Sequence, residues 1–206
     1  MASRCPIVVK LGGSFAYSDH LQDWIEALAN CAGRVVIVPG GGPFADTVRL
    51  AQIQMRFDDK AAHHMAVLAM EQYGRALASF NSALSLADSL DAIRRDQREK
   101  RVPIWMPSAM VFAARDIGQT WNVTSDSLAA WLAGKIGAGQ LLLIKHAKLS
   151  QGRARLKDLI AARILDDEFA RFLKLMPLPV SILGPSDHDT ALAAIHEGRS
   201  VGIAVQ

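Results

Sequence analysis

Short apolar runs without polar interruption constrain the fold of this chain more than any other feature. They lie at residues 7–11, 35–38, 102–106, 141–144, 180–183 and 201–205, and helical patterns separate most of them. Runs such as Val-Val-Ile-Val and Leu-Leu-Leu-Ile are apolar at every position, which indicates strands buried on both faces of a largely parallel sheet. The sequence therefore predicts an α/β protein with three layers, in which helices cover both faces of the sheet.

The chain of 206 residues contains no obvious linker or internal repeat, so we expect residues 1–206 to form one domain. Residues 58–80 contain no proline and carry apolar side chains at spacings of three and four, which predicts one long helix with an acidic start. We expect this helix to mediate formation of a homodimer.

Composition and charge exclude several classes of protein. The apolar runs are too short to cross a membrane, and the first residues lead into a strand pattern instead of a signal peptide, so we expect a cytoplasmic protein without a membrane partner. The net charge is only +3, and Asp96 and Glu99 interrupt the densest basic run, residues 94–101. This pattern is typical of a solvated helix face and does not favour nucleic-acid binding, whereas a small anionic substrate is compatible with it.

Two glycine-rich turns follow predicted strands. Gly12, Gly13 and Ser14 follow the first strand, and the second strand leads into Gly40, Gly41 and Gly42 before a helix. Glycines leave backbone N–H groups unshielded, and the start of a helix attracts anions. If the two strands are neighbours, the turns face each other at the carboxyl edge of the sheet and form two phosphate-binding cradles.

Two better-known phosphate motifs fit less well. Gly40-x-Gly42-x-x-Ala45 satisfies the degenerate dinucleotide fingerprint, which keeps a nicotinamide-dependent dehydrogenase as an alternative. However, Asp58 and Asp59, the acids about twenty residues further on, begin a helix and do not end a strand. Neither glycine turn is followed by the lysine of a Walker A motif.

Two charged residues lie beside these turns. Lys10 belongs to the first strand, so its stem would be buried and its ammonium would emerge at the turn, where an anion would compensate its charge. Asp126 falls in the first turn of a helix that Thr124 caps. An acid there stabilises the helix start, and it could also hold a catalytic lysine in place.

Three segments together resemble the amino acid kinase family: Lys10-x-Gly-Gly-Ser, the run from Pro39 to Asp46, and Asn122-x-x-Ser-Asp126. The resemblance covers nearly the whole chain. The helix segment that begins at His63-His64 and the run around Trp121 are most similar to one branch. That branch is the (aminomethyl)furanylmethyl phosphate kinase-like proteins of methanofuran and related one-carbon cofactor pathways.

The resemblance implies a kinase that uses ATP and Mg²⁺ on an acceptor that is itself a phosphate ester. Residues 1–123 would bind the acceptor and residues 124–206 the nucleotide. Lys10 would be catalytic and Asp126 would orient the lysine or lysines. The transferring phosphoryl group would meet Gly12, Gly13 and Ser14, whereas the acceptor would meet Gly40, Gly41, Gly42, Asn122 and Thr124. The protein itself would contribute no separate metal site.

The chain departs from the family after the fourth strand. Many relatives carry an acidic loop there, whereas this chain has Lys145-His-Ala-Lys148-Leu149. The second catalytic lysine of the family therefore has no secure match, and Lys145, Lys148 and Lys157 compete for the role. A uridylate kinase or other small-acid kinase, and a nonenzymatic nucleotide or anion binder, remain alternatives. His63 and His64 face different sides of a helix, and we expect packing and surface roles for them before acceptor binding.

Overall fold

The computed structural model describes residues 5–146 and 152–206, which form one sheet of eight strands. The spatial order is β3-β4-β2-β1-β5-β7-β8-β6. The neighbouring strands from β3 to β7 are parallel, β8 runs antiparallel to β7, and β6 runs parallel to β8. The strands are β1 (Ile7–Leu11), β2 (Val35–Pro39), β3 (Leu84–Ala87), β4 (Val102–Trp105), β5 (Gln140–Ile144), β6 (Arg153–Ala154), β7 (Val180–Leu183) and β8 (Ile203–Val205). The prediction of a largely parallel sheet is confirmed.

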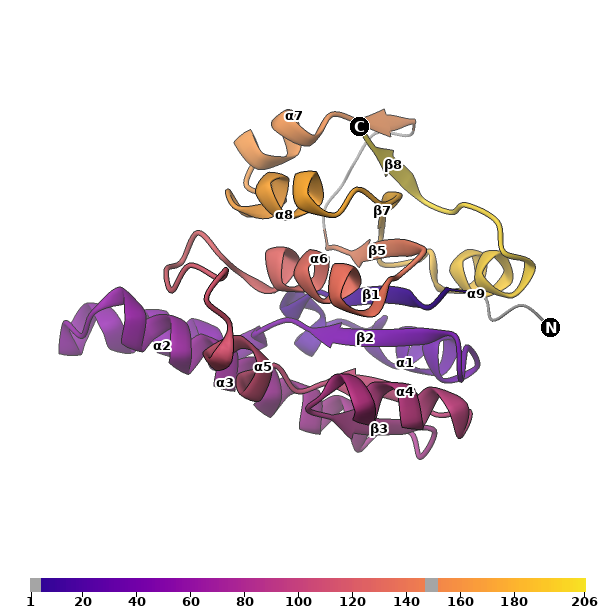
Figure 1. The fold of residues 1–206 in the computed structure, drawn as a ribbon, viewed down its shortest axis with the longest axis horizontal. Helices are drawn as coiled ribbons and strands as arrows, with labels where there is room; N and C mark the ends of the chain where they lie inside the picture. Colours follow the sequence, from indigo (N-terminus) through magenta and orange to yellow (C-terminus); the bar gives the residue numbers. More distant parts are fainter. Residues whose placement is uncertain (1–4, 147–151) are drawn as a thin grey trace.

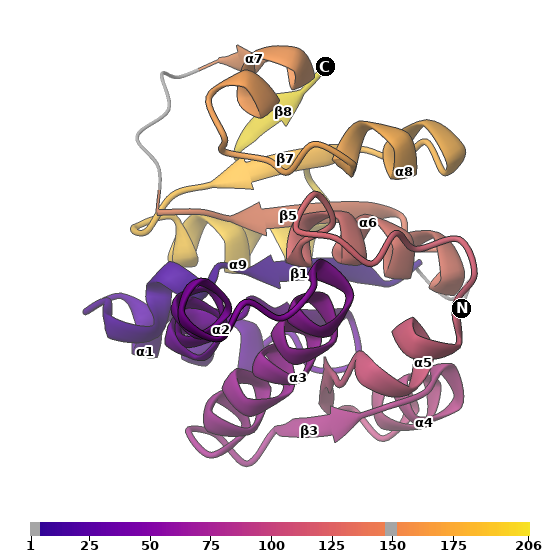
Figure 2. The same cartoon turned by 90° about the vertical axis from the view of Figure 1, so that its left-hand side faces the viewer.

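Helices cover both faces of this sheet (Figures 1 and 2). Side chains such as Val9 and Ile37 pack with residues of α1 and α9 on one face, whereas Val8 and Val36 pack with α6 and α8 on the other. The three predicted layers are therefore confirmed. The helices are η1 (Gly13–Tyr17, a 3₁₀ helix), α1 (Leu21–Ala29), α2 (Gly42–Met55), α3 (Asp59–Ala78), α4 (Leu90–Arg98), α5 (Ser108–Ala113), α6 (Ser125–Ile136), α7 (Leu156–Ala161), α8 (Phe169–Leu175) and α9 (His188–Glu197).

The three central strands end at the same level. Leu11 of β1 is in register with Pro39 of β2 on one side and with Ile144 of β5 on the other. Because these strands are parallel, the segments that follow them emerge at one edge of the sheet. Figure 2 looks from the side of this edge, with α2 and α3 in front of the sheet.

The long helix predicted over residues 58–80 is α3, which spans Asp59–Ala78. Asp58 caps it, because the Asp58 side chain accepts a hydrogen bond of 2.7 Å from the backbone N–H of Ala61. Among the predicted strands, only the last differs clearly: β8 begins at residue 203 instead of 201 and runs antiparallel to its neighbour. The short strands β3 and β6 were not predicted.

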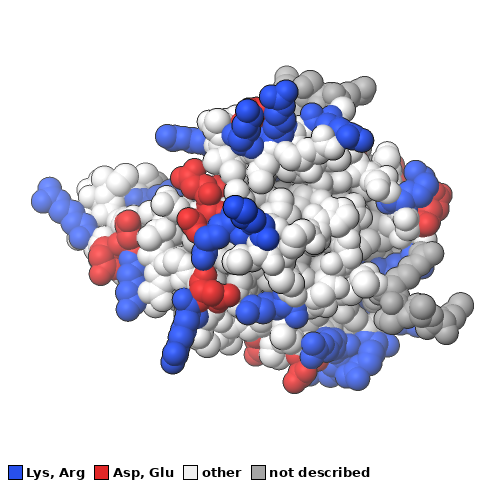
Figure 3. All heavy atoms as spheres, turned by 45° about the horizontal axis from the view of Figure 1, so that its top comes forward, with Lys and Arg blue, Asp and Glu red and all other residues white. Residues whose placement is uncertain are grey.

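Two surface properties of the described residues bear on possible partners. None of their helices is both long and apolar enough to cross a membrane. On the face shown in Figure 3, Lys and Arg side chains are scattered and Asp and Glu lie among them, so the described part of that face has no continuous basic patch.

Candidate active site

The two glycine turns touch each other at the carboxyl edge of the sheet. The backbone N–H of Gly12 donates to the carbonyl of Ile144 (3.1 Å), and that of Gly40 donates to the carbonyl of Leu11 (2.8 Å). A Cβ atom on Gly13 would lie 2.3 Å from the nitrogen of Gly42, and one on Gly40 would lie 2.3 Å from the nitrogen of Gly13. The turns can approach this closely only because these positions carry no side chain.

The second turn leads directly into α2. Gly42, the first residue of α2, has a φ of +55°, a conformation that glycine adopts without strain. Gly41 at the N-cap provides no side-chain hydrogen bond to the first turn of α2. The start of α2 therefore presents backbone N–H groups and the positive end of its dipole to the neighbouring cleft, an arrangement suited to an anion.

A buried cluster of three charges lies beside the turns. Lys10 is on β1, Asp126 is in the first turn of α6, and Lys145 directly follows β5. The Nζ atom of Lys10 lies 2.8 Å from Oδ1 of Asp126, and that of Lys145 lies 2.5 Å from Oδ2. One carboxylate thus holds two ammonium groups, and the cluster retains one excess positive charge in a buried position.

The cluster shifts the titration of its members. Burial acts to raise the pKa of Asp126, but the charges of Lys10 and Lys145 outweigh it and hold that pKa below its ordinary value. Burial and the neighbouring Lys10 lower the pKa of Lys145 to about 8, against the opposing attraction of Asp126. Lys145 is therefore charged at neutral pH but close to its titration range.

Asp166, which the sequence analysis did not single out, caps the helix that carries Asp126. Its Oδ2 accepts hydrogen bonds from the backbone N–H groups of Thr124 and Ser127 (2.9 and 3.0 Å) and from the Thr124 hydroxyl (2.7 Å). The Ser127 hydroxyl donates to the other oxygen. Burial, followed by the charge of Asp126, raises the pKa of Asp166, while these hydrogen bonds oppose the rise. Thr124 is the N-cap by position, as predicted, but Asp166 supplies the cap.

The glycine turns and the charged cluster border a cleft of about 700 Å³. The residues that line it include Arg49 of α2 and the segment Trp121–Asp126. The Arg49 guanidinium lies 4.5 Å from the centre of the Trp121 ring, and the indole N–H of Trp121 donates to Gln52 (2.7 Å). Arg49 was also missed, although it lies seven residues after Gly42 and therefore on the same face of α2.

His63 also lines the cleft, whereas His64 packs against Phe112 with ring centres 4.4 Å apart. Nδ1 of His63 lies 3.3 Å from the carbonyl oxygen of Thr120. Because a carbonyl oxygen can only accept, Nδ1 carries the proton in this contact. Burial lowers the pKa of His63, which favours a neutral ring beside the cleft.

The structure brings most of the predicted site residues to this cleft. Those lining it are Lys10, Gly12, Gly13, Ser14, Gly41, Gly42, Asn122, Thr124, Asp126 and Lys145. Gly40 is not among them, because it is buried in the contact between the turns. Of the competing lysines, Lys145 contacts Asp126, Lys157 lies on α7 outside the cleft lining, and Lys148 lies outside the described residues.

Fold and site together define an α/β protein built to hold an anion, such as a phosphoryl group, against backbone N–H groups and two lysines. Comparison with known proteins identifies the family within this class. Residues 6–148 match the sequence model of the amino acid kinase family, and the chain belongs to that family.

Individual relatives agree with this assignment. The chain is 26% identical over 140 residues to the [5-(aminomethyl)furan-3-yl]methyl phosphate kinase of Methanocaldococcus jannaschii, an alignment that covers 66% of this chain and 63% of that protein. The uridylate kinase of Archaeoglobus fulgidus superposes with a TM-score of 0.72 at 16% identity, covering 98% of this chain and 100% of that one. The UMP kinase of Ureaplasma parvum gives a TM-score of 0.69 at 15% identity, covering 98% and 99%. At these identities the two structures show a shared fold.

Proposed function

We propose that this chain is an ATP-dependent kinase that phosphorylates a small phosphate ester. The preferred acceptor is (aminomethyl)furanylmethyl phosphate, and its product would be the corresponding diphosphate, as in methanofuran-type cofactor biosynthesis. The observation that carries the proposal is the buried cluster in which one carboxylate, Asp126, holds Lys10 and Lys145 at the glycine turns. Within the described residues no second carboxylate pairs with either lysine, so the excess positive charge favours a bound anion.

In the proposed reaction, an oxygen of the acceptor phosphate attacks the γ-phosphorus of ATP. A phosphorus–oxygen bond forms to the acceptor, and the bond between the γ-phosphorus and the β–γ bridging oxygen breaks, releasing ADP. Lys10 and Lys145 neutralise charge on the transferring group, and Asp126 positions both ammonium groups. Preorganised cations of this kind accelerate phosphoryl transfer without a covalent intermediate.

We assign the nucleotide to the half formed by residues 124–206 and the acceptor to the half formed by residues 1–123. The start of α2 and Arg49 then provide positive charge for the acceptor phosphate, and Trp121 provides an aromatic surface for a ring. The name of the relative from Methanocaldococcus jannaschii supports a furan as that ring. The reaction would take place in the cytoplasm, where ATP is supplied.

Mg²⁺ fits this site as a partner of the nucleotide. Four carboxylates of the described residues line the cleft: Asp126 is engaged by two lysines, Asp166 caps α6, Asp46 pairs with Arg49 at 3.0 Å, and Asp167 is exposed. Mg²⁺ would therefore take most of its ligands from the phosphate oxygens of ATP and from water, and Asp167 would be the carboxylate available to supply a further oxygen. The chemical contribution of Mg²⁺ would be to neutralise charge between the β- and γ-phosphates.

The proposal is tested by a coupled assay of ADP release with (aminomethyl)furanylmethyl phosphate or UMP as the acceptor. Phosphorus NMR of the products would identify the diphosphate. We expect turnover to be fastest with the furan phosphate and to fall by about a hundredfold or more in Lys10→Ala, because one preorganised cation contributes about 3 kcal/mol to transition-state stabilisation.

Thermal-shift measurements with ATP and with NAD separate the alternatives. Faster turnover of UMP would show that the acceptor is a nucleotide and not a furan phosphate, and the proposal that the chain is a kinase would stand. Stabilisation by ATP without ADP release on either acceptor would favour a nonenzymatic binder. Stabilisation by NAD alone would reject the kinase.

A further inference from the structure

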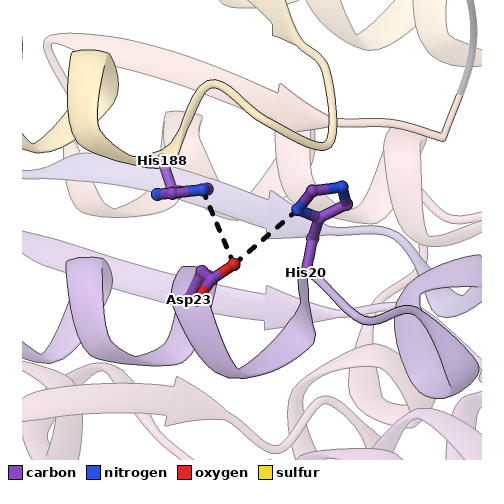
Figure 4. A group of neighbouring side chains, drawn as sticks. All are labelled: His20, Asp23 and His188. Carbon is purple, nitrogen blue, oxygen red and sulfur yellow. Dashed lines mark ion pairs between the residues drawn. The ribbon is translucent and has the colours of Figure 1, made fainter.

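Two imidazoles and one carboxylate gather where α1 meets α9, away from the cleft (Figure 4). His20 immediately precedes α1, Asp23 lies in its first turn, and His188 is the first residue of α9. One donor atom from each of the three side chains lies within 4.8 Å of the others. None of these residues lines the cleft.

Hydrogen bonds from other residues help to hold the backbone around the cluster. His20 and Asp23 are three positions apart at a helix start, so they project from the same side of α1. The indole N–H of Trp24 donates to the carbonyl of Pro185 (2.8 Å) and ties α1 to the segment before α9. Within that segment, the backbone N–H of Gly184 donates to the side chain of Asp187 (2.7 Å). The backbone that carries His20, Asp23 and His188 is therefore held in a defined position.

The spacing within the cluster leaves room for an ion. Nδ1 of His20 lies 3.7 Å and Nε2 of His188 lies 3.6 Å from the same oxygen of Asp23, and both rings point their nitrogens toward it (Figure 4). These separations are too long for hydrogen bonds. Donor atoms bound to one tetrahedral zinc at 2.0–2.1 Å lie about 3.3 Å apart, so small side-chain rotations would close the site.

The surroundings of His188 add an independent observation. While its Nε2 faces Asp23, its Nδ1 lies 3.3 Å from a carboxylate oxygen of Asp189. The Trp24 ring meets the imidazole edge-on, with centres 6.1 Å apart at 85°. A carboxylate on the far nitrogen is a feature that orients metal-binding histidines, although the Asp189 side chain is itself 91% exposed, and the Trp24 contact restricts the ring further.

We propose that His20, Asp23 and His188 bind one Zn²⁺ per chain, with solvent as the fourth ligand. Two imidazoles and one carboxylate suit zinc, whereas Mg²⁺ prefers oxygen ligands alone. The side chains of His20 and Asp23 are partly exposed, which leaves the fourth position open to water. The ion joins α1 to α9, which lie far apart in the sequence, so it stabilises the folded chain and takes no part in phosphoryl transfer.

The test is calorimetric titration of Zn²⁺ into the full, metal-free chain without an affinity tag. We expect one ion per chain and a higher melting temperature that a chelator reverses. His188→Ala and Asp23→Asn should each weaken binding by about tenfold or more. Two matched controls, His196→Ala on α9 and Asp19→Asn beside the cluster, should bind as the unaltered chain does. Unchanged affinity in both site variants, or the absence of one-to-one binding, would overturn the proposal.

Melting of the metal-free variants checks that a lost signal is not a loss of folding. If His188→Ala proves unstable, His20→Ala provides the same test at a more exposed position. Co²⁺ gives a second readout, because intense visible absorption reports coordination by four ligands. We expect this absorption in the unaltered chain and its loss in His20→Ala, and a spectrum that the substitution leaves unchanged would contradict the site.

Discussion

At the scale of single residues, Asp126 is central to the charged cluster, because its carboxylate contacts both Lys10 and Lys145. In Asp126→Asn the neutral amide cannot hold two ammonium groups, so we expect kcat to fall by about a hundredfold or more, while the KM for ATP changes far less. Steady-state kinetics over a range of ATP concentrations would measure both.

The matched control for this substitution is Asp96→Asn. Asp96 is also buried and paired with an arginine, at 3.1 Å, but it lies on α4 outside the cleft lining. The Asp96→Asn variant should be less stable than the unaltered chain and have the same kcat. A kcat for Asp126→Asn within about threefold of the unaltered chain would leave that residue with only the role of an acid at a helix start, which contributes about 0.3–1 kcal/mol.

We expect Lys145 to make the proposed reaction sensitive to alkaline pH. Its pKa is lowered to about 8 by burial and by Lys10. A lysine is charged below its pKa, so the free protein loses this cation as the pH rises through about 8, and kcat/KM for ATP should fall there. Lys145→Arg should move the fall to higher pH, because a guanidinium stays charged. The measurement is a pH profile of kcat/KM for both proteins. An identical fall at alkaline pH in both would show that a group other than Lys145 causes it.

At the scale of elements, the sequence predicts those features that depend only on the residues within a single strand, turn or helix. The central strands, the long helix α3 and the positions of Lys10 and Asp126 at element ends all follow from local patterns. The edge strand β3 has only four residues and a mixed burial pattern, so it shows too few repeats of a strand pattern to be recognised in the sequence. Asp166 is forty residues beyond Asp126, and only tertiary packing places it on the start of α6.

The contact between the two glycine turns gives a prediction at this scale. A Cβ on Gly40 would collide with the backbone of Gly13, 2.3 Å from its nitrogen and 2.9 Å from its Cα, whereas one on Gly118 would come no closer than 3.7 Å to any neighbour. We therefore expect Gly40→Ala to lower the free energy of unfolding by about 1–3 kcal/mol and to reduce turnover, with Gly118→Ala nearly neutral. Denaturant unfolding compares the two, and equal stability would show that the turns can separate without cost.

At the scale of the whole molecule, the cluster exists because β1 and β5 are neighbours. Each strand carries one lysine at or just beyond its carboxyl end, and α6 places Asp126 between them. More than a hundred residues separate β1 from β5, so the sequence could predict the pieces of the site but not which lysine joins Lys10. The same holds for the reversed direction of β8, which no local pattern encodes.

The surface of α2 and α3 leads to the last prediction, a homodimer. The helix α3 buries Tyr73 and Leu77 against the sheet but leaves Met65 and Leu68 exposed by 39% and 44%, so its part in a dimer stays a prediction. Beside it, α2 leaves Leu50, Ile53 and Met55 exposed by 65%, 70% and 73%. An apolar surface of this kind is typically covered by a partner, and a second copy of the chain can cover it symmetrically.

We expect light scattering to give the mass of a dimer at micromolar concentration, and Ile53→Asp to give a folded monomer, because the new carboxylate would be buried without a partner. The matched control is Leu175→Asp on α8, an exposed leucine remote from α2 in the fold, which should leave the dimer intact. A monodisperse monomer for the unaltered chain would reject the dimer. It would leave the catalytic proposal untouched, because every residue of the charged cluster belongs to one chain.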